Sequence, residues 1–359
     1  MKIERIVFSA RGKVEIAEAD LDQRLQSGEV LIRTACSMIS AGTELAALNG
    51  THSKSGLENP PEWLKYPSVP GYLVCGEVVD RGAGVTGFKA GDRVVGEGQG
   101  VWNSHCSYLL MDSSSHKLVP IHPDVTFEEG VFTKMGSIAM TGPRVLHPEL
   151  GDSIAVMGLG VVGQLASRLS VLAGAGQVVG IDPLAGRREI AAGFKGVKAI
   201  PPDDPFLAAG IAQGGRLAGF DHVIEASGHP AAFHHACRIT RLKGKIAILS
   251  SPHRTMEIRL YDHIHSRGLQ ILGAHGAVLP QTENVYARWT DGAQRRFFMQ
   301  LMAEKRLDVL PIISHRVEYS EAPDIYRGLA ENPGDYLGVL FYWNGYGTKR
   351  SKKRGGGKE

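Results

Sequence analysis

Three glycines in this sequence have the spacing of a dinucleotide-binding turn. Gly158-x-Gly160-x-x-Gly163 directly follows the apolar run SIAVM and opens a segment with helical periodicity, and Asp182 ends the next apolar run. The first glycine permits a tight turn, the second lets the backbone approach a pyrophosphate, and the third lets helix and strand pack closely. The helix N-terminus would then face the phosphates with free N–H groups. This order of strand, glycines, helix, strand and acid predicts a bound dinucleotide.

The acid that ends the second run bears on which dinucleotide binds. A carboxylate at Asp182 would accept hydrogen bonds from the adenosine ribose and repel a 2′-phosphate, which favours NAD(H) over NADP(H). Arg187 and Arg188 follow closely and keep NADP(H) open as an alternative. Besides the three glycines and Asp182, the candidate cofactor-binding residues are Leu159, Val161, Val162, Arg187, Ser227 and Ser250.

The segments that must position these residues show two distinct patterns of expected secondary structure. From Met1 to about Val119, short β-like runs alternate with Gly and Asp at spacings typical of a small barrel. From about Thr126, helices and strands alternate, which indicates a parallel sheet covered by helices. After about Gln281, the closing strands resemble the first region. We therefore expect an α/β protein that leaves a barrel domain, builds a nucleotide-binding domain, and returns. The expected segments are 1–125 for the barrel, 126–285 for the doubly wound parallel sheet, 286–343 for the return to the barrel, and 344–359 for a disordered basic tail.

The charge of the chain is concentrated at its end. Residues 344–359 carry six Lys or Arg side chains against one Glu, whereas the whole 359-residue chain has a formal net charge of only +3. The remainder is thus near neutral and offers no sign of a phosphate-binding surface. A basic, Gly-rich tail cannot bury apolar area, so we expect it to be solvated. Weak contact of the tail with nucleic acid or an acidic surface is the alternative.

The cysteines and the N-terminus indicate a compartment. Cys36, Cys75, Cys106 and Cys237 are far apart and lack C-x-x-C spacing, which argues against a disulfide framework or a structural zinc site. The first residues alternate like a strand, and no apolar run reaches the length of a membrane span. We expect a cytoplasmic protein with reduced thiols and no membrane association.

The chain resembles the medium-chain dehydrogenase/reductase superfamily over nearly its whole length. The resemblance rests on VPGYLVCGEVVDRGAGVTGFKAGDRVVG, LHPELGDSIAVMGLGVVGQLA and FDHVIEASGHPAAFHHACRITRLKGKIAILS. It implies a GroES-like β-barrel catalytic domain, a Rossmann domain, a small-molecule substrate in the cleft between them, and a homo-oligomer, either dimer or tetramer. Within the superfamily, SAGTE at 40–44 and PGY at 70–72 look similar to polyol dehydrogenase-like proteins and to bacteriochlorophyllide hydroxyethyl dehydrogenases.

The sequence departs from the zinc-dependent members of that superfamily at the metal ligands. Where those members offer Cys, then His-Glu, then Glu or Cys, this chain has Ser40 or Ala41, Tyr72-Leu73, and Lys134. None of these is a good zinc ligand, and a lysine ammonium would repel the metal. The four-cysteine lobe of the structural zinc is also missing. The resemblance therefore implies a dehydrogenase without zinc.

Another group must then stabilise the alkoxide that develops during hydride transfer. Tyr72 and Lys134 stand at positions that converge on the metal in zinc-binding relatives, so we expect their side chains in one pocket. A Tyr hydroxyl can donate to an alkoxide, and a nearby ammonium would lower its pKa toward neutrality. Thr43, at the place of the relay hydroxyl, is expected to pass a proton or to bond backbone. In the alternative, Lys134 pairs with Glu44 and Tyr72 only fills space.

Other polar residues are weaker candidates. Five histidines could act as acid or base, His275 foremost, although each is also explained as an exposed or core residue: His52, His105, His263, His265 and His275. The long stretch 50–72 contains Trp63 and two adjacent prolines. It is explained equally well as a sugar-binding loop over the cleft or as a loop packed for stability.

These observations predict a zinc-independent, NAD(H)-dependent oxidoreductase. It would transfer a hydride between nicotinamide and a secondary alcohol or ketone of a sugar, polyol or ring-bearing metabolite. The alternative is a quinone or enoyl reductase, because many metal-free relatives reduce activated C=C bonds. A nucleotide-sensing protein without enzymatic activity is the outside possibility.

Overall fold

The computed structural model describes residues 1–98, 103–207 and 218–347, and it separates into two compact units. The terminal unit comprises residues 1–134 and 295–359, and the central unit comprises residues 135–294. These borders lie later in the chain than the expected 125/126 and 285/286. The first is displaced because helix α2 (Phe127–Gly130) packs against strands of the terminal unit. The expected tail at 344–359 lies outside the described residues from residue 348 onward.

The terminal unit is built from two sheets. Strands β1 (Lys2–Ala10) and β2 (Lys13–Asp20) form an antiparallel hairpin. A second sheet has the order β14-β15-β3-β4-β5-β7, with β6 paired to β3. Its strands are β3 (Glu29–Met38), β4 (Val74–Arg81), β5 (Arg93–Gly96), β6 (Tyr108–Asp112), β7 (Val119–Pro120), β14 (Ile313–Glu318) and β15 (Gly338–Tyr342). Strand β15 pairs antiparallel with β3, so segments before and after the central unit build one sheet.

Helices close the terminal unit over an aromatic core. Helix α9 (Ala322–Glu331) buries Ala322, Ile325, Tyr326 and Leu329, a spacing that gives a helix one apolar face. This face packs in a cluster with Phe8, Phe341, Trp343 and other residues. The short helices are α1 (Ala41–Leu48), η1 (Glu62–Leu64), η5 (Leu310–Ile312) and η6 (Tyr319–Glu321). Helices α3 (Thr133–Leu146) and α8 (Asp291–Ala303) cross the borders between the units.

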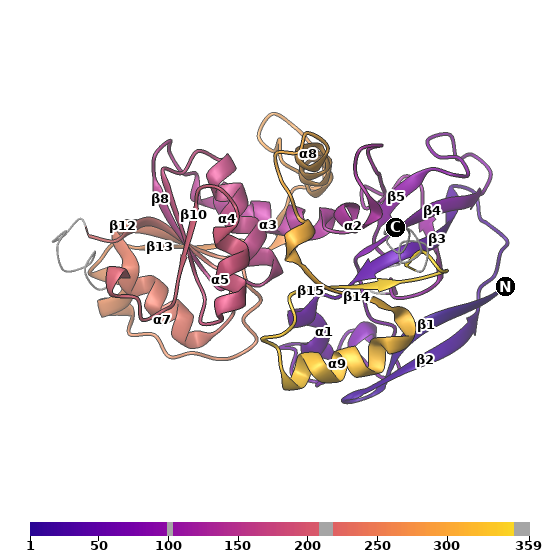
Figure 1. Ribbon diagram of the computed structural model, residues 1–359, viewed down its shortest axis with the longest axis horizontal. Helices are drawn as coiled ribbons and strands as arrows, with labels where there is room; N and C mark the ends of the chain where they lie inside the picture. The colour runs from indigo at the N-terminus through magenta and orange to yellow at the C-terminus, as the bar shows by residue number, and fades with distance from the viewer. Residues whose placement is uncertain (99–102, 208–217, 348–359) are drawn as a thin grey trace, which may run out of the picture. The chain divides into compact units, whose positions relative to one another are not determined.

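The central unit is a six-stranded parallel sheet with the order β10-β9-β8-β11-β12-β13. Its strands are β8 (Ser153–Met157), β9 (Gln177–Ile181), β10 (Val197–Ile200), β11 (Phe220–Glu225), β12 (Thr240–Ile248) and β13 (Gln270–Gly273). Helices α4 (Val161–Leu172), α5 (Ala185–Ala192) and α7 (Pro230–Ile239) accompany them (Figure 1), and η3 (Tyr261–His265) and η4 (Gly276–Val278) are single turns. The chain order reverses between β8 and β11, which is the doubly wound arrangement of a Rossmann fold. The predicted α/β fold class is confirmed.

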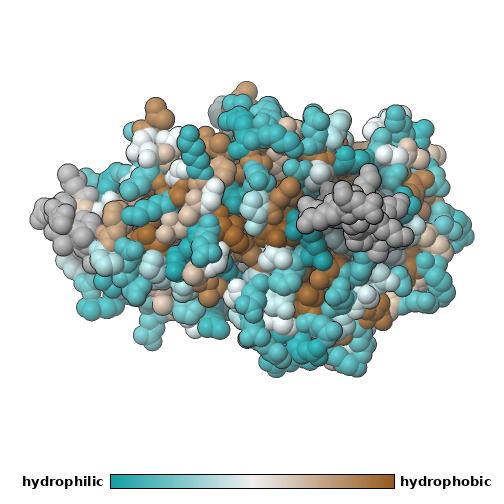
Figure 2. Space-filling model, in the orientation of Figure 1, coloured by the Kyte–Doolittle hydropathy of each residue, from teal (hydrophilic) through white to brown (hydrophobic). Residues whose placement is uncertain are grey.

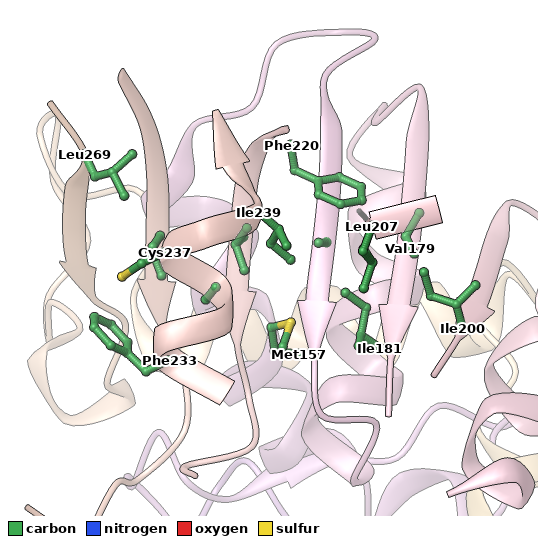
Figure 3. Close-up of a cluster of buried hydrophobic side chains, with 14 residues drawn as sticks. Met157, Val179, Ile181, Ile200, Leu207, Phe220, Phe233, Cys237, Ile239 and Leu269 are labelled. Atoms are coloured by element: carbon green, nitrogen blue, oxygen red, sulfur yellow. The ribbon is translucent and has the colours of Figure 1, made fainter. Parts of the chain in front are cut away.

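Both faces of this parallel sheet are buried. Adjacent residues of β9, Val178 and Val179, belong to different apolar clusters, as expected for a strand covered on both sides. Figure 3 shows Phe233 and Cys237 of α7 in one cluster with Met157 and Ile181 from neighbouring strands. The strand ends are therefore held by a packed core, which positions the loops that follow them.

The surface carries few large apolar side chains. Hydrophilic residues cover most of the face seen in Figure 2. Among the described residues, the most exposed large apolar side chains are Leu150, Val278, Val285 and Tyr286. In the part of the chain that the structure describes, no helix is long and apolar enough to cross a membrane.

Candidate functional site

The glycine turn between β8 and α4 is shaped as the motif requires. Gly158 has φ +88°, and a Cβ there would lie 2.7 Å from the Cβ of Ser227. A Cβ on Gly163 would lie 1.8 Å from the carbonyl oxygen of Gly158, so helix and turn touch through glycine. At Gly160, the N-cap of α4, a Cβ would meet no atom within 4 Å. The turn thus leaves open space beside a helix N-terminus, which fits the pyrophosphate of a dinucleotide.

Asp182 lies directly after β9 and closes this turn from the side. Its Oδ2 accepts a hydrogen bond from the backbone N–H of Leu159 at 2.8 Å, and its Oδ1 accepts one from Leu184 at 2.9 Å. Arg187 Nη1 lies 4.0 Å from Oδ2. Each carboxylate oxygen retains a second lone pair, which a ribose hydroxyl can use. The residues present therefore fit a dinucleotide, and Asp182 and Arg187 are the candidates for contact with its ribose.

The remaining candidate cofactor residues differ in what they offer. Leu159 is fully buried with its N–H directed at Asp182, whereas Val161 and Val162 are partly exposed in the first turn of α4. The hydroxyls of Ser227 and Ser250 both donate to the carboxylate of Glu225.

Glu225 is a residue that the sequence analysis missed. It is the last residue of β11, is almost completely buried, and also accepts the N–H groups of Ser227 at 2.8 Å and Gly228 at 3.0 Å. A buried carboxylate with these donors joins the ends of β11 and β12. The sequence feature that could have indicated Glu225 is an acid at the end of an apolar run, followed by A-S-G.

In the terminal unit, Tyr72 lies in a group of hydroxyls. Its OH is 2.6 Å from Ser40 Oγ, and Ser40 Oγ donates to Thr43 Oγ1 at 3.5 Å. Burial, together with the charges of Glu44 and Glu97, raises the pKa of Tyr72 to about 12, and the hydrogen bonds with Ser40 and Thr43 act in the opposite direction. The expectation of a pKa lowered toward neutrality is therefore wrong. The phenol is desolvated and faces carboxylates, so its neutral form is favoured at physiological pH.

The partner of Lys134 is Glu97, which the sequence analysis did not single out. Lys134 Nζ lies 3.4 Å from Glu97 Oε1, Lys117 Nζ lies 3.3 Å from Oε2, and the fully buried Arg295 contacts Oε1. Burial disfavours the charge on Glu97, but Arg295 and Lys134 outweigh it and lower the pKa of this carboxyl. Because Glu97 also acts on Tyr72, Tyr72 and Lys134 both lie near one carboxylate.

Glu44 is fully buried beneath this group. Its carboxylate accepts hydrogen bonds from Ser40 N–H at 2.8 Å, from His105 Nε2 at 3.1 Å and from the OH of Tyr326. The alternative expectation paired Glu44 with Lys134. In the structure these three groups donate to Glu44, and Lys134 contacts Glu97 instead. Glu44 thus holds the turn that carries Ser40.

His105 and Gly71 extend the buried network. A carboxylate can only accept, so His105 Nε2 carries a proton, and Nδ1 forms a hydrogen bond with Ser37 Oγ at 2.7 Å. Trp343 Nε1 donates to the same Ser37 Oγ at 2.9 Å. Gly71 has φ +91°, and a Cβ there would lie 2.6 Å from the imidazole. The glycine of PGY is therefore required by the histidine ring behind it.

The other candidates lie elsewhere. His275 is exposed and accepts the N–H of Ala277 at 3.1 Å, which caps η4. His52 packs edge-on against Trp63, with ring centroids 5.0 Å apart, and Trp63 packs on the aromatic core. His263 packs against His234, and His265 against Tyr261. In the stretch 50–72, the OH of Tyr66 donates to two carbonyls at the end of α1, which holds this part of the loop against α1.

The side chains at the expected metal position do not fit zinc. Ser40, Tyr72 and Lys134 offer two hydroxyls and an ammonium in place of thiolate, imidazole and carboxylate ligands. Within residues 1–98, 103–207 and 218–347, no group of three or more His, Cys, Asp or Glu side chains could hold a metal ion.

Comparisons with known proteins agree with this architecture. An alcohol dehydrogenase GroES-like domain model matches residues 26–170, and a zinc-binding dehydrogenase model matches residues 161–290. D-guloside 3-dehydrogenase of Escherichia coli K12 is 24% identical and aligns over 94% of this chain and 100% of its own. L-threonine 3-dehydrogenase of Shewanella sp. ANA-3 is 28% identical over 80% of this chain and 87% of its own.

A solved structure shows the same fold. A zinc-binding-dehydrogenase-like protein from Sinorhizobium meliloti, bound to NADP, superposes with a TM-score of 0.77 at 20% identity, covering 95% of this chain and 99% of its own. The predicted resemblance is confirmed. With its GroES-like and Rossmann domains, the chain belongs to the medium-chain dehydrogenase/reductase superfamily of oxidoreductases.

Proposed function

We propose that this protein is a zinc-independent dehydrogenase that interconverts a secondary alcohol and a ketone. The observation that carries the proposal is the Tyr72–Ser40–Thr43 hydroxyl group, whose residues stand in the sequence at positions where the resemblance implies metal ligands and a relay hydroxyl in zinc-dependent members. The D-guloside and L-threonine 3-dehydrogenases are both named for reactions at carbon 3 of a hydroxylated metabolite. A sugar, polyol or related hydroxylated metabolite is accordingly the proposed substrate class.

The cofactor would be held by the glycine turn and Asp182. When bound, the nicotinamide ring supplies or accepts the hydride. Asp182 favours NAD(H), since its carboxylate would repel a 2′-phosphate. Arg187 lies 4.0 Å from that carboxylate, and its positive charge would allow weaker binding of NADP(H).

Tyr72 would be the proton donor in ketone reduction. A phenol with a pKa of about 12 is protonated at neutral pH and can give its proton to the oxygen that becomes an alkoxide. Ser40 Oγ, 2.6 Å away, would donate a hydrogen bond to the resulting phenolate, and a proton from water would return to Tyr72 along the Thr43 and Ser40 hydroxyls. Lys134 adds positive charge near the developing alkoxide. Glu44 acts as a positioning residue, because it holds Ser40 through the backbone.

Tyr72→Phe tests this role, because it keeps the ring and removes the proton. Turnover should fall by roughly 10²–10⁴, the range for loss of a general acid or base. NADH affinity should stay unchanged, since the cofactor turn lies in the central unit. Ser40→Ala should give a smaller fall, because Tyr72 retains its own proton. Turnover of Tyr72→Phe close to the parent rate would contradict the proposal and leave Tyr72 as a packing residue.

We further propose that the protein forms a homodimer through the edge strand β13. This strand ends the described six-stranded sheet, and the segment that follows it in the chain exposes Val285 at 92% and Tyr286 at 97%. Such apolar side chains are better covered by a second copy than by water. Light scattering should give twice the mass of one chain, and the double variant Val285→Asp with Tyr286→Asp should give the mass of a single chain. A monomeric parent protein would refute the dimer.

A further inference from the structure

A partly open cavity of about 240 Å³ lies in the terminal unit and is lined by residues of β1, β2 and β6. Ile3 and Arg5 are two residues apart on β1, so their side chains leave the same face of this strand, and both line the cavity. A backbone bridge between Arg5 and Cys106 holds this wall against the segment that precedes β6. None of the described lining residues belongs to the cofactor turn or to the hydroxyl group at Tyr72. The cavity is therefore additional to both of these sites.

The lining is largely apolar and leaves room for a small organic molecule. An apolar cavity of about 150 Å³ is large enough to bind benzene. The larger space here can accommodate a six-membered ring or a short aliphatic chain together with one polar group. Asn103 and Tyr108 add an amide and a hydroxyl to the lining. The large aliphatic side chains of the lining are Ile3, Leu21, Val69, Leu109 and Leu110.

Arg5 is the positively charged residue among the described residues that line the cavity. Its Nε–H group is buried and has no hydrogen-bond partner, and its guanidinium forms no ion pair with a carboxylate of residues 1–98, 103–207 or 218–347. A buried donor without an acceptor is unfavourable, and proteins normally satisfy such a group with a side chain, a water molecule or a ligand. The cavity thus presents a donor that a bound acceptor would satisfy.

The other charges at the cavity leave this guanidinium available to an anion. Asp20 also lines the cavity, but its Oδ2 lies 3.0 Å from Lys2 Nζ, and the Asp20 side chain is 77% exposed. Lys2 and water therefore screen the Asp20 carboxylate. Arg5 acts on a more enclosed part of the lining: burial raises the pKa of the Cys106 thiol to about 12, and the charge of Arg5 opposes this shift. The cavity thus combines apolar walls with one positive charge.

We propose that this cavity binds a small carboxylate with a compact apolar body, and that Arg5 recognises its carboxylate group. Arginine binds carboxylates through two parallel N–H···O bonds, and such a pair would give the buried Nε–H of Arg5 its acceptor. The apolar body would cover Ile3, Leu21 and Leu110 and remove their surface from water. The single arginine and the apolar walls favour a singly charged carboxylate over phosphate. This ligand is distinct from the substrate of the proposed dehydrogenase, so the inference does not depend on the proposed function.

The test is a titration of the full chain, with methyl-labelled isoleucine and leucine, followed by NMR. The probes are benzoate, benzamide, acetate and inorganic phosphate. Benzamide keeps the shape of benzoate without its charge, and acetate keeps the charge without the ring. Benzoate should bind roughly tenfold or more tightly than each of the other three probes. It should shift the methyl signals of Ile3, Leu21, Leu109 and Leu110.

Three outcomes of this titration would overturn the proposal. Benzamide binding as tightly as benzoate would show that Arg5 does not select for charge. Phosphate binding more tightly than benzoate would show that the apolar walls do not contribute. Absence of shifts at the lining methyl groups at tens of millimolar benzoate would leave a cavity that holds water alone.

Variants separate recognition by Arg5 from general effects of charge. Arg5→Gln should lower benzoate affinity to that of benzamide, and Arg5→Lys should restore only part of it, because lysine lacks the paired donors. Arg11→Gln is the matched control, since it removes the same charge from the exposed turn of the β1–β2 hairpin, outside the described lining. Unchanged benzoate affinity in Arg5→Gln would refute the role of Arg5.

A charge-neutral variant tests the cavity itself. Ala19 lines the cavity and lies opposite Ile3 in the hairpin, so Ala19→Leu should fill part of the space and weaken benzoate and benzamide alike. Thermal unfolding close to that of the parent protein would show that each variant is folded. Unchanged binding of both probes to folded Ala19→Leu would place their site elsewhere and refute the proposal. Because binding is the readout, these results are independent of Tyr72→Phe, which tests proton transfer.

Discussion

Gly71→Ala should lower the free energy of unfolding of the terminal unit by more than the addition of one methyl group usually does. The left-handed conformation costs a residue with a Cβ about 1–2 kcal/mol. The added Cβ would also lie 2.6 Å from the His105 ring, where van der Waals contact needs about 3.5 Å or more. His105 cannot yield without weakening its bonds to Ser37 and Glu44, and each buried group left unsatisfied costs about 1–3 kcal/mol. We expect a total loss of about 3–5 kcal/mol.

Urea unfolding followed by tryptophan fluorescence measures this loss, because Trp343 is buried and bonded to Ser37. Gly42→Ala is the control, since a Cβ at Gly42 within α1 would meet no atom within 4 Å and should raise stability by roughly 0.5–1 kcal/mol. In the double variant Gly71→Ala with His105→Ala, the overlap is gone, so the combined cost should be less than the sum. A cost below about 1 kcal/mol for Gly71→Ala would refute the argument.

Four further outcomes are expected. Asp182→Ser should narrow or reverse the preference for NADH over NADPH in fluorescence titrations, and tighter NADPH binding by the parent would show that Arg187 dominates. Alcohol oxidation needs the Tyr72 phenolate, so its rate should rise with pH across the range below about 12, while ketone reduction needs the phenol and should stay flat; a plateau in oxidation near pH 7 would contradict the raised pKa. Elemental analysis should find well under one zinc per chain, and chelators should leave activity unchanged; a stoichiometric, chelator-sensitive zinc would end the metal-free account. Native protein should react slowly with a thiol reagent, because Cys36, Cys75, Cys106 and Cys237 are all buried and burial raises the pKa of the last three thiols. The reaction should become fast in denaturant, and a fast reaction of the native protein would contradict this burial.

The cofactor turn could be predicted because its information is local. The glycine spacing, the flanking apolar runs and Asp182 lie within one strand-helix-strand unit, and their geometry follows from backbone sterics and side-chain periodicity. The hydroxyl group at Tyr72 was only half predictable. Residue type and resemblance suggested Tyr72, but the sign of its pKa shift depends on desolvation and on carboxylates brought in from other elements.

The sequence by itself determined the parallel sheet, the dinucleotide turn, the absence of typical zinc ligands at the expected positions, and the superfamily. Only the tertiary structure decided which charges meet. Glu97 and Arg295 are 198 residues apart in the chain, and Glu44 and Tyr326 are 282 apart. Such pairs leave no periodic or spaced pattern in a sequence, because the chain between them is free to vary while the packed core brings their side chains together. The pairing of Lys134 with Glu97, and the buried position of Glu44, are consequences of that packing.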